Sequence, residues 1–124
     1  LRKFSQSKAK QIFKKPDGAE LITIKKYLRN RVEHLAKRHG FQFNKVSFKN
    51  MKTRWGSCSP KNNISFNILM AHLPKKFQDY IILHELLHTR IKDHKKGYWA
   101  ELDRLTGDAN GFHKELKEKY TFYN

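Results

Sequence analysis

The segment HELLH, residues 84–88, places two histidines and a glutamate at a spacing that suits metal chemistry. Residues four apart lie on one face of an α-helix, so the imidazoles of His84 and His88 can converge on one ion. Glu85 is displaced by about 100° around the helix axis. Its carboxylate can reach a metal-bound water without taking a ligand position. The segment therefore predicts a hydrolytic zinc site in which Glu85 is the general base.

The alternative is a helix whose histidines and glutamate simply reach solvent. The neighbouring side chains argue against it, because the helix is apolar on nearly all sides. Burying three polar side chains there without partners is unfavourable, and a metal ion supplies partners. The apolar neighbours are Tyr80, Ile81, Ile82, Leu83, Leu86 and Leu87.

A zinc ion with an open position for water needs a third protein ligand, and His94 is our first choice. In an unbroken helix His94 would lie about 15 Å beyond His84 along the axis. The chain must therefore turn between them. We expect Asp93 to cap a new helix, with His94 at its first position. Glu101 is the main alternative ligand, followed by Asp103, Asp108 and His113; we interpret His34, His39 and His72 as ordinary surface or strand-end histidines.

The elements around this segment follow from apolar periodicity. Asp17 and Glu20 form a predicted capping box for a helix over residues 18–39 that ends at Gly40. Its apolar positions are Leu21, Ile24, Leu28, Val32 and Leu35. Residues 1–17 are predicted to be a basic arm or partial helix, and residues 18–124 one domain.

Three later segments are predicted to be strands: apolar and polar residues alternate in the first and last, and the middle one is short and rich in β-compatible residues. These segments are 41–48, "TRWGSCS" at 53–59, and 64–68, with turn residues at 59–63. We expect them to form a small antiparallel sheet of about three strands. Further helices are predicted from Pro74 through HELLH, over 94–105, and over 109–120 after Asp108. The order of elements indicates an α+β fold.

Composition restricts the class of protein. Residues 1–52 hold 15 Lys/Arg against 3 Asp/Glu, which is +12 of the total charge of +16. Such a field attracts nucleic acid, nucleotides or acidic lipid, although solubility and a solvated helix face are the simpler explanation. The single cysteine, Cys58, excludes an internal disulfide and is interpreted as a small buried apolar residue. No stretch is long enough for a membrane span, and we expect a cytoplasmic protein.

The segments "KTRWGSCSPKNNISFNILMAHLP" and "DYIILHELLHTRIKDHKKGYW" resemble the YgjP-like metallopeptidase family, distant relatives of the SprT-like and WLM proteases. The resemblance covers about residues 20–120. It implies a compact zincin-like fold with Zn²⁺ on His84, His88 and His94 and with Glu85 as base. The flanks of His94 depart from the family pattern. Family chains usually carry more sequence upstream, so we expect the catalytic part of a longer protein. The matching residues are Trp55, Gly56, Ser57, Cys58, Phe66, Asn67, Tyr80, Tyr98 and Trp99.

We therefore hypothesise a zinc-dependent metallopeptidase. An edge strand, from either the Trp55 or the Phe66 segment, would hold an extended peptide by backbone pairing. Arg54, Trp55 and Asn67 are the predicted substrate-binding residues, although Arg54 also fits a simple surface cation. One alternative is a nucleotide or phosphate-ester hydrolase, or a DNA-associated protease, recruited by the basic half. A second is a non-catalytic nucleic-acid-binding module with structural zinc.

Overall fold

The computed structural model describes residues 16–120. Within this range, helix α2 spans Gly18–His39 and has the ends that the sequence predicts. The Asp17 side chain accepts a hydrogen bond of 2.8 Å from the backbone N–H of Glu20. Gly40 ends the helix at a φ of 72°, a left-handed conformation that glycine adopts without strain. The helix buries Leu28, Val32, Leu35 and Ala36. Residues 1–15 of the predicted arm lie outside the described residues, so that interpretation stays a prediction.

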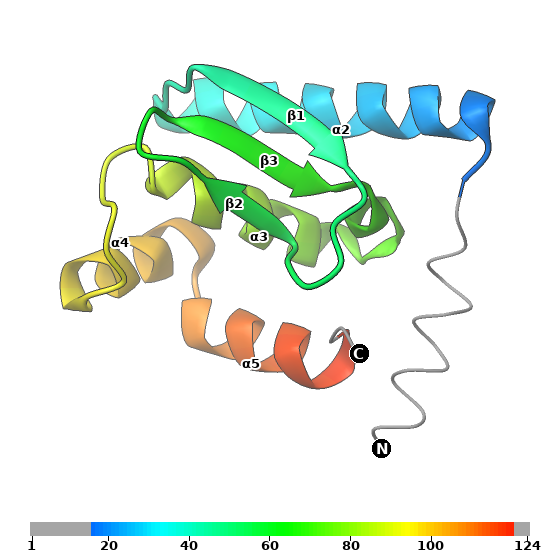
Figure 1. Ribbon diagram of the computed structural model, residues 1–124. Coiled ribbons are helices and arrows are strands. Elements are labelled where there is room, and N and C mark those ends of the chain that lie inside the picture. The colour runs from blue at the N-terminus through cyan, green and yellow to red at the C-terminus, as the bar shows by residue number, and fades with distance from the viewer. Residues whose placement is uncertain (1–15, 121–124) are drawn as a thin grey trace.

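The described residues form one mixed sheet of three strands, not the antiparallel sheet that we expected. Strands β1 (Lys45–Lys49), β2 (Gly56–Cys58) and β3 (Asn63–Asn67) have the order β1-β3-β2. The chain places β2 at the far edge before β3 returns to the centre (Figure 1). As a result β3 is antiparallel to β2 and parallel to β1. Phe48 and Phe66 stack at the parallel pair, with 6.0 Å between ring centroids.

Helices α2 and α3 lie behind the sheet, and α4 and α5 extend the helical layer from there (Figure 1). A 3₁₀ helix, η1 (Ile68–His72), leads from β3 to Pro74 and α3 (Lys75–Leu87). Helix α3 is buried on nearly all sides, as its composition predicts, and all six apolar residues from Tyr80 to Leu87 belong to the core. No helix within residues 16–120 is long and apolar enough to cross a membrane.

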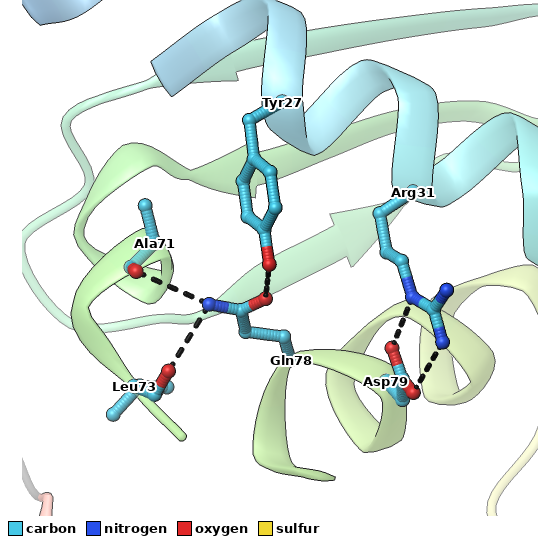
Figure 2. Close-up of polar contacts among 6 residues, drawn as sticks. All are labelled: Tyr27, Arg31, Ala71, Leu73, Gln78 and Asp79. Carbon is cyan, nitrogen blue, oxygen red and sulfur yellow. Dashed lines mark hydrogen bonds and ion pairs between the residues drawn. The ribbon is translucent and has the colours of Figure 1, made fainter. Parts of the chain in front are cut away.

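Two polar contacts fix α2 against the start of α3 (Figure 2). The buried Gln78 amide donates to the carbonyls of Ala71 and Leu73, and its oxygen accepts a 2.6 Å hydrogen bond from Tyr27. Arg31 and Asp79 form a two-pronged ion pair with both N···O distances at 2.7 Å. Because every polar atom of the amide has a partner, Gln78 is accommodated in the core.

The helix after HELLH begins later than predicted. Helix α4 spans Lys96–Thr106 with Lys95 at the N-cap, so neither Asp93 nor His94 has the expected place. Instead, the Asp93 side chain accepts from the backbone N–H of Lys95, two residues on. This short-range turn redirects the chain before the helix starts. Helix α5 (Ala109–Lys119) follows the prediction, with Asp108 as its N-cap.

Candidate active site

The last turn of α3 and the connection that follows it bring three histidines together. His84 lies in the helix, His88 at its C-cap, and His94 in the connection to α4. One ring nitrogen from each lies within 4.8 Å of the other two, and Nε2 of His88 is 2.9 Å from Nε2 of His94. His94 reaches the cluster from a loop, where we expected a helix N-terminus.

Hydrogen bonds and ring stacking hold His84 and His88 in place. Nδ1–H of His88 donates to the carbonyl of Ile91 at 2.9 Å, which leaves the Nε2 lone pair directed at the cluster. Tyr98 donates its hydroxyl to the His84 carbonyl at 2.7 Å and stacks on the His88 ring, with centroids 4.5 Å apart. Burial raises the pKa of Tyr98, so this phenol remains a donor. Burial lowers the pKa of His88, which favours the neutral imidazole that metals bind.

The donor set fits a divalent cation of the zinc type. Nitrogen ligands bound tetrahedrally at about 2.1 Å from zinc lie about 3.4 Å apart. That value falls between the 2.9 Å separation of the closest pair and the 4.8 Å limit of the group. Imidazole nitrogens also suit zinc better than they suit magnesium or calcium, which prefer oxygen.

The Glu85 carboxylate lies beside the histidine cluster and beneath strand β2. Its side chain is buried, with Oε2 3.3 Å from Nδ1 of His84. The backbone of Gly56 packs directly on it: a Cβ at residue 56 would lie 2.8 Å from Cγ of Glu85. Glu85 therefore occupies space that exists only because residue 56 has no side chain.

A cavity of about 390 Å³ opens over the cluster. Strand β2 forms one wall, and the C-terminal part of α3 forms the floor. Two cations, Arg54 and Lys92, lie on its border. Burial raises the pKa of the Cys58 thiol, which argues against Cys58 as a nucleophile. The lining residues are Arg54, Gly56, Ser57, Cys58, His84, Glu85, His88, Lys92 and His94.

The other predicted residues have different places. Trp55 lines an adjoining cavity. Asn67 is fully buried and lines neither cavity; its amide donates to the carbonyls of Met51 and Arg54, and its oxygen accepts from Leu69 N–H. These hydrogen bonds show that Asn67 fixes, from inside the core, the loop that carries Arg54.

Three of the four alternative ligands have hydrogen-bond partners elsewhere, and the fourth, His113, packs edge-on against Trp99 with 5.6 Å between ring centroids. Glu101 forms a two-pronged contact with Arg104 at 2.7 Å, while Asp103 and Asp108 bind backbone N–H groups around the start of α5. Sequence reasoning did not assign roles to Gly56 and Tyr98. Gly56 belongs to the motif "WGSC" and Tyr98 to "GYW". The sequence does not indicate that Gly56 packs on Glu85 or that Tyr98 stacks on His88.

A family model described as "YgjP-like, metallopeptidase domain" matches residues 3–119, nearly the whole chain. The chain belongs to this family. Membership makes it a metal-dependent hydrolase with a peptidase domain, in agreement with the geometry of the histidine cluster. No curated protein matches the sequence.

Two solved structures of archaeal metallopeptidase zymogens share the fold. Abylysin of Pyrococcus abyssi superposes with a TM-score of 0.64 at 21% identity, over 77% of this chain and 99% of the other. Jannalysin of Methanocaldococcus jannaschii gives 0.62 at 20% identity, over 74% and 95%. At these identities the likeness concerns the fold, and it confirms the predicted α+β class.

Proposed function

We propose that this chain is a zinc-dependent metallopeptidase in which His84, His88 and His94 hold the ion and Glu85 is the general base. The observation that carries the proposal is the meeting of three imidazoles and one buried carboxylate in a single cavity beside an edge strand. When bound, the cation polarises the scissile carbonyl and lowers the pKa of water to about 7.

Glu85 moves the protons of the reaction. Its carboxylate removes a proton from water as the water oxygen forms a bond with the carbonyl carbon of the peptide. The same carboxyl then donates that proton to the amide nitrogen as the C–N bond breaks, which releases a neutral amine. Contact with Gly56 and His84 fixes the carboxylate in one position for both transfers.

Strand β2 is the proposed backbone partner of the substrate. In the described chain β2 pairs only with β3, and its residues Gly56–Cys58 line the cavity. Its second edge is thus available to an extended peptide. The Phe66 segment, which we also considered, is wrong as an edge because β3 is the central strand. Arg54 borders both cavities, and we propose that it contacts substrate carbonyl groups, whereas Asn67 is buried and lines neither cavity.

The test is hydrolysis of fluorescently labelled casein with and without chelator, together with metal content per chain. The wild type should lose activity with chelator and regain it with Zn²⁺. Glu85→Gln should retain one zinc per chain and lose turnover, and His94→Ala should lose the metal. Glu101→Gln, a matched carboxylate change outside the cluster, should alter neither. Full activity of Glu85→Gln would refute the proposed base.

The alternatives have less support. Family membership favours an enzyme over a non-catalytic module, and the histidine group within residues 16–120 contains three ligands, whereas a structural zinc site usually has four. No finding points to a nucleotide or nucleic acid as substrate.

A further inference from the structure

A second cavity, of about 250 Å³, lies directly beside the first. The two share Arg54, Gly56, His84 and Glu85, so the proposed base borders both. The second cavity is smaller than the 300–1,000 Å³ that typical small-molecule pockets occupy. It therefore has room for about one side chain of a substrate that passes the proposed base.

The walls of this second cavity are mainly apolar, although Arg54, Tyr80, His84, Glu85 and His113 also line it. Trp55 contributes from the chain just before β2, Ile81 from α3, and Leu116 from α5. Ile81 and Leu116 are core residues, and Trp55 packs against the core, so these walls are held rigidly. Among the residues that line the cavity, Glu85 is the only carboxylate. A charged side chain would lose hydration against the apolar walls, and the two groups that could pair with it, Arg54 and Glu85, also border the first cavity, where we propose other roles for them.

The position of the cavity along β2 indicates which substrate residue enters it. The second cavity lies at the Trp55 end of β2, and the histidine cavity continues along the strand to Cys58. Antiparallel pairing is the slightly more stable arrangement. An antiparallel peptide runs from the Cys58 end toward the Trp55 end, so it crosses the histidine cluster first and the apolar cavity afterwards.

We propose that this apolar cavity is a specificity pocket, and that it accepts one large apolar side chain, such as leucine, methionine or phenylalanine, from the residue directly after the scissile bond. The inference rests on the proposed peptidase function. It adds the substrate class: extended peptides cleaved on the N-terminal side of a large apolar residue.

The first experiment compares quenched fluorogenic peptides that differ only in the residue after the intended scissile bond, with cleavage sites mapped by mass spectrometry. We expect kcat/KM for leucine or phenylalanine to exceed that for alanine by at least about tenfold, since one methylene in an apolar pocket is worth about 10- to 200-fold. Aspartate and lysine should be cleaved more slowly than alanine.

Variants of the pocket wall supply the matched comparison. Leu116→Trp should fill the cavity and shift the preference toward alanine, and Trp55→Ala should widen it and favour phenylalanine over leucine. Leu105→Ala changes a leucine on α4 that borders a separate cavity, and should leave the preference unchanged. Circular dichroism checks that each variant is folded. Hydrolysis without any preference at this position, or a preference that both wall variants retain, overturns the proposal.

A binding measurement separates the pocket from the peptidase activity. The chain has two tryptophans, so Trp99→Phe leaves Trp55 as the single indole reporter. Leucinamide should change the Trp55 fluorescence, and glycinamide should not. If the wild type hydrolyses no peptide but Trp55 responds selectively to leucinamide, the proposed function fails and the pocket stands. If there is neither hydrolysis nor a selective response, both fail.

Discussion

Replacement of Gly56 by alanine tests how tightly the backbone of β2 confines the proposed base. Carbon–carbon contacts of this kind are ordinary from 3.4 Å, and the new Cβ would lie 2.8 Å from Cγ of Glu85. Glu85 or β2 must therefore move by at least 3.4 − 2.8 = 0.6 Å. Gly56 does not have a positive φ, so alanine adds no backbone strain and the effect comes from this contact alone.

A misplacement of about 1 Å in a catalytic group lowers the rate by about 100-fold. We expect kcat/KM of Gly56→Ala to fall by about 10- to 100-fold, mainly through kcat, while zinc content stays at the wild-type level. Overpacking of this kind also lowers the free energy of unfolding by about 1–3 kcal/mol. The assays are steady-state kinetics on one fluorogenic peptide, metal content per chain and urea denaturation.

Gly97→Ala is the control, because a Cβ at residue 97 has no heavy atom within 4 Å. It lies in α4, where alanine is favoured over glycine, so this variant should retain wild-type kcat/KM and have equal or slightly higher stability. If Gly56→Ala keeps the kcat of the wild type, the idea that the bare backbone of β2 positions Glu85 is refuted.

Three further predictions concern the metal, pH and the core. Zinc at 100 times its dissociation constant should raise the free energy of unfolding of the wild type by about 2.7 kcal/mol, and that of His94→Ala much less, as urea denaturation will measure. Burial lowers the pKa of His39, His88 and His113 below the ordinary 6.5, so the unfolded chain binds more protons than the folded chain as pH falls below that value. The metal-free protein should therefore be most stable above pH 6.5 and lose stability toward pH 5.5; a flat profile in chelator would contradict this. The Tyr80 hydroxyl is buried and has no hydrogen-bond partner in the described chain. Tyr80→Phe should therefore leave the free energy of unfolding unchanged or raise it by about 1 kcal/mol. A decrease of more than about 1 kcal/mol would mean that the hydroxyl has a partner.

Helix α2 and the buried helix α3 were predictable because their signals are local. A capping aspartate, a helical apolar period and a terminal glycine are enough to define α2. In α3 an apolar surface on all sides indicated burial, and the spacing of His84 and His88 placed two rings on one face. These features depend on residues within one or two turns of each other.

The parallel pairing of β1 and β3 was not predictable from strand patterns. Alternation shows which face of a strand is buried, but not which strand is its neighbour or in which direction that neighbour runs. The same limit applies to Gly56 and Asn67, whose roles depend on contacts with Glu85 and with residues 51–54. His94 was placed in the cluster, but its backbone was assigned wrongly because Asp93 forms a turn two residues before the helix cap.

The buried amide of Asn67 also constrains how the sheet can assemble. Its side chain holds carbonyls 13 and 16 residues upstream, and its own N–H donates to the Trp55 carbonyl at 2.9 Å. A slip of β3 by one residue would turn Phe66 toward solvent and break all three bonds together. Asn67 therefore favours one register of the sheet, and in that register the strand that borders the histidine cavity is already in place.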